Sequence, residues 1–118
     1  MTGAPSIPES PLDAALHNPT RLAVAAFLSA CAEAEFAVIR DHCQVSDSVL
    51  SKAASALETA GYVEIRKGHV GKRPRTWLAL TPNGREAMAR HVTALQEIVA
   101  AARSAACALG RQGGSSSL

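Results

Sequence analysis

The sequence has few aromatic residues, little net charge and no long hydrophobic run. Aromatic side chains make up 3% of its 118 residues, so a core has to be built mainly from Leu, Val, Ile and Ala, and such Ala-rich segments favour helices. The longest apolar stretch, Leu22–Ala32, is about half of what a membrane span requires. No Lys or Arg precedes Arg21, which is unlike a secretory signal. We therefore expect a single-domain cytoplasmic protein with no membrane partner.

The three cysteines do not form a recognisable disulfide or metal-binding pattern. Cys31, Cys43 and Cys107 are widely spaced, and the sequence contains no C-x-x-C pair. We interpret them as small hydrophobic core residues and expect no metal site and no cofactor. The sequence also lacks a G-x-S-x-G motif, a phosphate-binding Gly-rich loop and paired carboxylates near a histidine. We assign no catalytic residues and do not expect an enzyme.

The N-terminal half of the chain predicts three helices. Residues 1–11 contain three prolines without periodicity and predict a flexible arm. Asn18-Pro19 is a typical helix start, so we expect one helix over 19–32, followed by a second over 35–42. Ser46 as N-cap and Gly61 as terminator predict a third helix over 47–60. The buried stripe of this third helix is predicted to comprise Leu50, Ala53, Ala54 and Leu57.

After Gly61 the hydrophobic period changes from that of a helix to that of a strand. Residues 62–66 and 76–80 predict two strands, joined by a long basic loop over 67–75, and so form a hairpin. Thr81-Pro82 predicts a last helix over 82–109, followed by a flexible Gly/Ser tail over 110–118. The expected fold class is mainly α with a small β-hairpin (α+β), in one domain over 12–109.

The last predicted helix carries a heptad-type apolar seam. Its apolar residues are spaced alternately four and three apart, and they are Met88, Val92, Leu95, Val99, Ala102, Ala106 and Leu109. This seam has two interpretations: packing on Leu12, Leu16 and Phe27 of the same chain, or dimerisation. Little protein is left to cover the seam within one chain, which favours dimerisation. The predicted dimer interface is formed by Leu12, Leu16, Met88, Val92, Leu95, Val99 and Ala102.

The order of these elements is that of a winged helix-turn-helix. Two short helices and a tight turn precede a third helix with a small polar face, and a basic hairpin follows. A helix fits the major groove of DNA, where Ser and Lys side chains contact base edges. Residues 66–75 contain five cations and no acid, and at a hairpin tip such cations reach phosphates or a minor groove. The pattern therefore predicts a DNA-binding protein.

Three segments resemble MarR/ArsR-like winged helix-turn-helix transcriptional regulators. They are residues 45–52 (VSDSVLSK), 57–64 (LETAGYVE) and 73–85 (RPRTWLALTPNGR), and the resemblance covers roughly residues 12–100. It implies a homodimeric, sequence-specific DNA-binding regulator, usually a repressor, with helix 47–60 in the major groove and hairpin 62–80 as the wing. Position by position, the resemblance implies DNA contacts at Ser46, Asp47, Ser48, Ser51, Lys52 and Ser55 of the helix and at Lys72, Arg73 and Arg75 of the wing.

Two other functions remain open. Positions 53 and 56 are Ala where relatives often carry polar or basic residues, so Lys52 is the only cation of the predicted recognition helix. This feature favours a protein-interaction module built on the same scaffold. The other alternative is a regulator whose DNA binding responds to a small molecule, metal or oxidant, with Cys31, Cys43 or Cys107 as the sensing residue.

Overall fold

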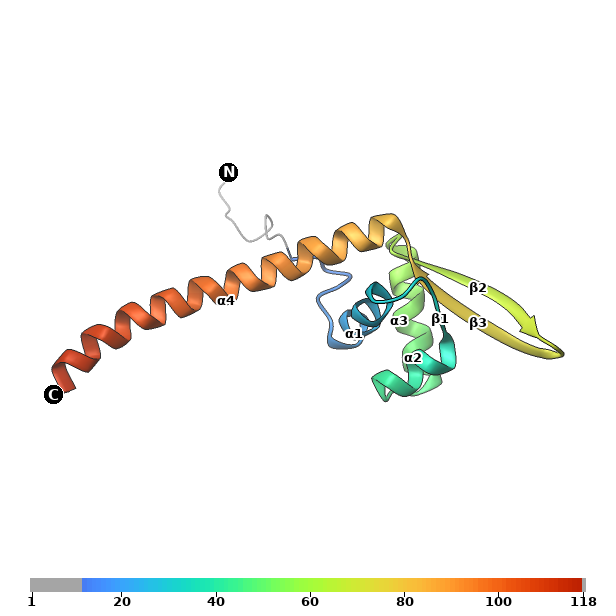
Figure 1. The fold of residues 1–118 in the computed structure, drawn as a ribbon, viewed down its shortest axis with the longest axis horizontal. Helices are drawn as coiled ribbons and strands as arrows, with labels where there is room; N and C mark the ends of the chain where they lie inside the picture. Colours follow the sequence, from blue (N-terminus) through green and yellow to red (C-terminus); the bar gives the residue numbers. More distant parts are fainter. Residues whose placement is uncertain (1–11, 118) are drawn as a thin grey trace.

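A computed structural model describes the backbone of residues 12–117 and the side chains of residues 12–110. The elements follow in the order α1 (Pro19–Ser29), β1 (Ala34–Glu35), α2 (Phe36–Cys43), α3 (Asp47–Thr59), β2 (Val63–Val70), β3 (Arg73–Leu80) and α4 (Pro82–Ser117). Helices α1–α3 form a cluster from which the β2–β3 hairpin and α4 extend in opposite directions (Figure 1). This is a winged-helix fold with a long C-terminal helix, so the predicted fold class is confirmed. The predicted arm over 1–11 lies outside the described residues.

The helix starts follow the capping signals in the sequence. The Asn18 side chain accepts a hydrogen bond from the Arg21 amide, and the Ser46 side chain accepts one from the Val49 amide. α1 ends at Ser29, earlier than predicted. The Arg85 guanidinium donates to the carbonyls of Ser29, at 3.4 Å, and Cys31, at 2.9 Å, and so satisfies acceptors at the helix end.

The core lies between α1, α2, α3 and the sheet. The predicted stripe of α3 is buried as expected, with Leu50 and Leu57 fully inaccessible to solvent. Leu28 of α1, Ile39 of α2 and Leu78 of β3 complete the centre of the core, and each is at most 1% exposed. The face of α3 opposite this stripe is left in contact with solvent.

The sheet is antiparallel, in the order β1–β3–β2. Strands β2 and β3 pair continuously from Val63 opposite Leu80 to Val70 opposite Arg73. The prediction of a long loop over 67–75 is therefore wrong, since only Gly71 and Lys72 lie between the strands. Gly71 has a φ of +64°, which a tight hairpin turn requires and which glycine adopts without a steric penalty. Strand β1 was not predicted because two residues carry no periodicity.

Helix α4 continues to Ser117, so the predicted flexible tail over 110–118 is helical as far as the structure describes it. Elongating an existing helix adds one hydrogen bond per residue, whereas starting one is costly, so a helix can extend through residues that would not begin one. At its start, the Thr81 hydroxyl accepts from the Gly84 amide at 2.9 Å and donates to the Gly61 carbonyl at 2.7 Å. Thr81 therefore ties the helix to the residues that follow α3.

Two residues predicted at the dimer interface are buried within the chain. Leu16 is 0% exposed and Met88 is 8% exposed, and both belong to the core cluster. Both side chains are therefore covered within the chain, because the first turns of α4 lie against α1 and the segment before it. For this part of the seam, packing within one chain is what occurs.

His91 connects α4 to the segment before α1. Its ring is fully buried, and Nδ1 accepts a hydrogen bond from the Asp13 amide at 3.0 Å. The Asp13 carboxylate accepts from the Tyr62 hydroxyl, which raises the pKa of Tyr62. The His17 and His91 rings lie 5.7 Å apart in an edge arrangement. Burial, and next the proximity of His17, lower the pKa of His91, so the ring stays neutral near pH 7.

Candidate nucleic-acid interface

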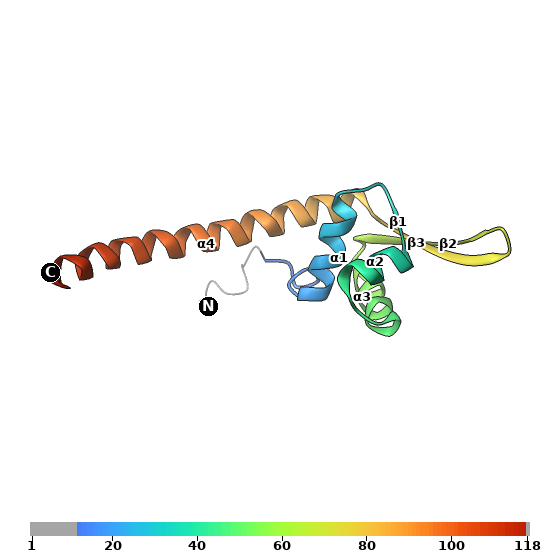
Figure 2. The same ribbon diagram turned by 60° about the horizontal axis from the view of Figure 1, so that its bottom comes forward.

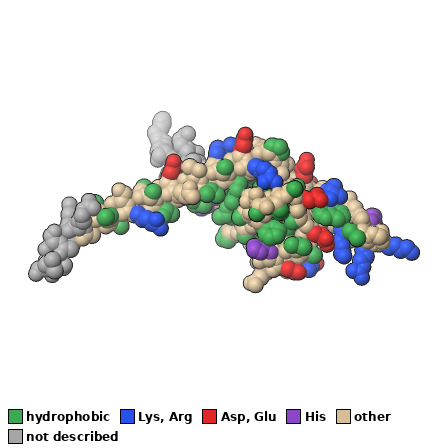
Figure 3. Space-filling model, in the orientation of Figure 1, with side chains coloured by type: hydrophobic (Ala, Val, Ile, Leu, Met, Phe, Trp, Pro, Cys, Tyr) green, Lys and Arg blue, Asp and Glu red, His purple; other side chains and the backbone are tan. Residues whose placement is uncertain are grey.

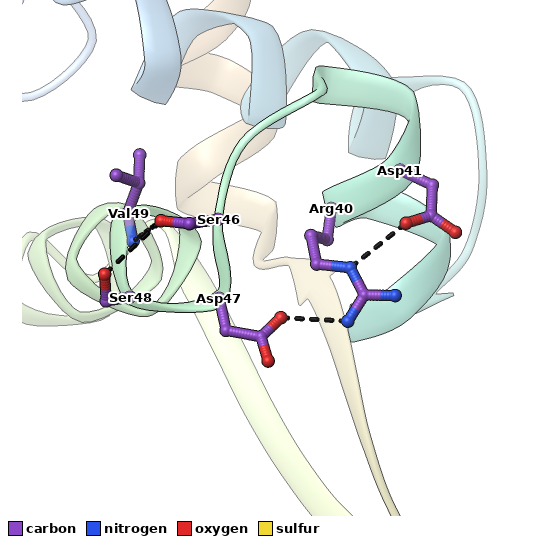
Figure 4. Close-up of polar contacts among 6 residues, drawn as sticks. All are labelled: Arg40, Asp41, Ser46, Asp47, Ser48 and Val49. Carbon is purple, nitrogen blue, oxygen red and sulfur yellow. Dashed lines mark hydrogen bonds and ion pairs between the residues drawn. The ribbon is translucent and has the colours of Figure 1, made fainter.

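The exposed face of α3 carries the side chains predicted to contact DNA. Ser46, Asp47, Ser48, Ser51, Lys52 and Ser55 are all exposed. Helix α3 itself lies on the side of the helical cluster away from α4 (Figure 2). Ser46 also has a structural role, because its hydroxyl accepts from the Val49 amide at 3.2 Å. The Ser48 hydroxyl lies 3.3 Å from that of Ser46 (Figure 4). Ser51, Lys52 and Ser55 form no side-chain hydrogen bond with any residue of the described range 12–110 and present their polar atoms to solvent.

At the start of α3, Asp47 is paired with a residue of α2. The Arg40 guanidinium binds Asp47 at 2.9 Å and Asp41 at 3.0 Å (Figure 4). The hydrogen bond with Asp47, followed by that with Asp41, raises the pKa of Arg40. The sequence reasoning missed Arg40, because a single cation in a short helix carries no signal until α2 and α3 are placed side by side.

The wing consists of β2 and β3 and carries cations on both of its faces. Because strand side chains alternate, Lys67 and His69 lie on one face, whereas Arg66 lies on the other together with its cross-strand partner Trp77. The register places Arg73 and Arg75 on this second face as well. Lys and Arg side chains gather over the far end of the wing (Figure 3).

Two of the wing arginines are held by acids near β1. Arg66 donates two hydrogen bonds to the Glu33 carboxylate, at 2.9 and 3.0 Å, and its guanidinium lies 4.3 Å from the Trp77 ring centre. Arg75 pairs with Glu35 at 3.3 Å. The predicted DNA contact Arg75 is therefore partly neutralised and only half exposed. These two pairs fix the base of the wing against the segment between α1 and α2.

Three wing cations, Lys67, Lys72 and Arg73, form no ion pair within the part of the chain whose side chains the structure describes. Lys72 occupies the turn, and Arg73 begins β3. Lys67 is one of the five cations predicted to reach phosphates, but it was not among the wing residues assigned individually as DNA contacts. These cations are the wing charges that no acid of the described side chains neutralises.

A groove connects the α3 face with the wing. It has a volume of about 520 Å³, and its polar wall includes Ser51, Ser55 and the acid Glu58 of α3 and Lys67 of β2. The floor is apolar and includes Ile65 and Leu78. The fold thus brings Ser51 and Ser55 of α3 and Lys67 of the wing together on one surface, whereas Arg73 and Arg75 lie on the other face of the wing.

The three cysteines are free thiols and form no disulfide. Cys31 is half buried, and its thiol lies within hydrogen-bonding distance of the Phe27 carbonyl, at 3.6 Å. Burial raises the pKa of the Cys43 thiol, which lowers the fraction present as reactive thiolate. Cys107 lies on the exposed part of α4. Within the range the structure describes, no group of three or more His, Cys, Asp or Glu residues is arranged to hold a metal ion.

Residues 20–99 match the family described as winged helix DNA-binding domain, so the chain belongs to that family. A transcriptional regulator homologue from Pyrococcus horikoshii OT3 is similar over 80% of this chain and 94% of its own, with 27% identity and a TM-score of 0.73. A MarR-family transcriptional regulator from Silicibacter pomeroyi is 25% identical, with a TM-score of 0.57, over 71% of this chain and 56% of its own. The chain is therefore a winged-helix protein of the DNA-binding class, and it is similar to transcriptional regulators that include a MarR-family member.

A further solved structure shares the fold at lower identity. The YusO protein from Bacillus subtilis is 24% identical, with a TM-score of 0.63, over 74% of this chain and 61% of its own. The chain thus spans nearly all of the Pyrococcus protein but only about three fifths of the other two. No curated protein matches the sequence.

Proposed function

We propose that the protein is a homodimeric transcriptional repressor that binds specific DNA sequences, with α3 in the major groove and the β2–β3 wing on the adjacent backbone or minor groove. The observation that carries this proposal is the groove that joins the exposed Ser51 and Ser55 of α3 to Lys67 of a wing whose tip exposes Lys72 and Arg73. Small hydroxyl side chains let a helix approach base edges closely, and Lys and Arg supply the electrostatic part of the affinity.

The two kinds of contact have different roles. On α3, Ser48, Ser51, Lys52 and Ser55 are positioned to bond base edges, since none of them is bonded within the protein core. On the wing, Lys67, Lys72 and Arg73 bind phosphate, which sets position and affinity without reading sequence. Because α3 carries only one cation of its own, binding energy comes mainly from the wing and from the presence of two copies.

Dimerisation is supported by the exposed part of α4. At about 1.5 Å per residue, this 36-residue helix is roughly 54 Å long, and beyond its first turns it projects away from the rest of the fold. Ile98 is 50% exposed, Val99 is 46% exposed and Leu109 is 68% exposed. An isolated helix with such an apolar stripe is stabilised by a partner helix, and Leu95, Val99 and Ala102 remain the proposed contact positions.

By length and composition, Pro82–Gly110 would also suffice to cross a membrane. However, Ala87, Met88 and His91 at the start of this segment are packed into the winged-helix core, where a bilayer cannot surround them. We therefore assign the apolar stripe of α4 to a second copy of the chain and place the regulator in the cytoplasm, with access to DNA.

The role of the wing is tested by removing its two cations at the turn. We expect K72A/R73A to weaken binding to every duplex and to reduce the slope of log K against log salt by about one unit per lost phosphate contact. The matched control is R90A/R103A, which removes the same charge from α4. An effect of the same size in both variants would show that net charge alone matters and would refute a wing contact.

The proposed dimer is tested by two variants that each place one negative charge on α4, either in the apolar stripe or on the opposite face. V99E places a carboxylate in the apolar stripe, whereas S104E places one on the opposite face of the same helix. We expect analytical ultracentrifugation to give a dimer for the wild type and S104E and a monomer for V99E. A wild-type monomer at micromolar concentration, or a V99E dimer, would contradict the proposed interface.

A further inference from the structure

Arg40 is a charged residue at the edge of the proposed interface whose position is fixed by two acids. It lies in α2, and its side chain is 34% exposed, whereas those of Asp41 and Asp47 are 73% and 71% exposed. Its Nε bonds the Asp41 carboxylate, and its Nη1 bonds the Asp47 carboxylate (Figure 4). These two contacts favour a position of the guanidinium beside the start of α3.

The cluster has two properties that matter for binding a polyanion. It contains two carboxylates and one guanidinium, so its net charge is negative. This charge lies at the N-terminal end of α3, the helix that is proposed to enter the major groove of DNA. It also leaves Nη2 of Arg40 without a hydrogen bond to any residue in the range 12–110, so one edge of the guanidinium can still donate. A guanidinium donates up to five hydrogen bonds, which permits it to bond a carboxylate and a phosphate together.

We propose that the Arg40–Asp47 pair determines specificity in the DNA complex: Arg40 contacts a backbone phosphate through Nη2, and Asp47 orients it while disfavouring DNA that offers no matching base. This inference rests on the proposed function. Non-specific binding is almost entirely electrostatic, so a carboxylate facing the phosphate backbone penalises it directly. When α3 is seated in the major groove of the correct sequence, Asp47 instead meets base-edge donors such as the cytosine amino group, and the penalty is relieved.

Substitutions of Asp47 and Arg40 are therefore expected to change DNA affinity in opposite directions. In D47N the side chain keeps its shape and loses its charge, so we expect a scrambled duplex to bind about fivefold more tightly while the preferred duplex gains little. In R40A a phosphate contact is lost and two acids are left unpaired, so we expect both duplexes to bind about tenfold more weakly, with a salt slope smaller by about 0.9. The double variant R40A/D47N should lie between R40A and the wild type, because it removes one of the unpaired acids.

The test is fluorescence anisotropy with two duplexes at three salt concentrations. One is the tightest-binding duplex that the wild-type protein selects from a random-sequence library, and the other is its scrambled sequence. The matched control is E97Q, which removes the same charge from an exposed position of α4, and thermal unfolding of each variant checks that the fold is retained.

The expected result is a ratio of the two affinities that falls about fivefold in D47N and is unchanged in E97Q. If the wild type discriminates between the duplexes but D47N keeps the same ratio, or if D47N and E97Q behave alike, the specificity role of the pair is refuted and the proposed function stands. If the wild type selects no duplex at all, the proposed function itself fails, together with this inference.

Discussion

Gly84 lies at the start of α4, where the helix passes the residues that follow α3. A Cβ atom at this position would lie 2.1 Å from the Tyr62 carbonyl oxygen and 2.9 Å from its carbonyl carbon. The obstacle is the backbone of Tyr62, which two hydrogen bonds hold in place. The Tyr62 carbonyl accepts from the Thr81 amide at 3.0 Å, and the Tyr62 amide donates to the Leu57 carbonyl at 2.9 Å. Glycine is required here for close approach and not for its backbone freedom.

The substitution G84A should therefore destabilise the protein, although replacing Gly by Ala inside a helix normally stabilises it by up to about 1 kcal/mol. Relieving the overlap costs about 1–3 kcal/mol of strain, and losing the Thr81–Tyr62 hydrogen bond costs about 1 kcal/mol more. We expect a net loss of about 2 kcal/mol, seen as a decrease in Tm of roughly 8 °C in a thermal melt followed by circular dichroism.

The matched control is G110A, in the same helix. A Cβ at Gly110 would have no neighbour within 4 Å, so this variant should gain helicity without any decrease in Tm. A Tm for G84A equal to or above that of the wild type would refute the close approach of α4 to Tyr62.

Three other predictions concern the cap, the buried histidine and the base of the wing. T81A should lower the free energy of unfolding by about 1 kcal/mol in urea denaturation, and T81S should restore most of it, since the hydroxyl is what caps α4. Because the pKa of His91 is lowered in the folded protein, the unfolded chain takes up a proton at higher pH than the folded one. The free energy of unfolding that His91 contributes is therefore fully present above about pH 6.5 and decreases as the pH falls below it. In H91Q this decrease should be smaller, and an unchanged pH dependence would contradict the lowered pKa of His91. R66A removes the guanidinium stacked on Trp77 and should shift the emission maximum of this single tryptophan, whereas an unshifted spectrum would mean that the two side chains are not in contact in solution.

The sequence predicts the order and type of the main elements because their signals are local. Asn18-Pro19, Ser46 and Thr81-Pro82 each specify a helix start through bonds to neighbouring amides, and the structure places helices at all three. The apolar stripe of α3 is equally local, since its period alone defines the buried face.

What the sequence does not predict depends on contacts between distant segments. Strand β1 forms only because β3 provides a pairing edge, and Arg66 finds its partner Glu33 only when the wing folds back on the α1–α2 connection. The heptad seam is continuous in sequence, but its first positions pack inside the chain and its later ones are exposed, a division that depends on where α1 crosses α4.

The central claim is that two copies of the chain bind one specific DNA sequence. The most direct measurement is titration of the wild-type protein into a pseudo-palindromic duplex that it has selected from a random library, with half-sites about one helical turn apart, against a scrambled duplex. We expect two chains per selected duplex and an affinity about 10³-fold or more above that for the scrambled one at physiological salt. Equal, weak binding to both duplexes would contradict the claim and favour a protein-interaction role for this winged-helix surface.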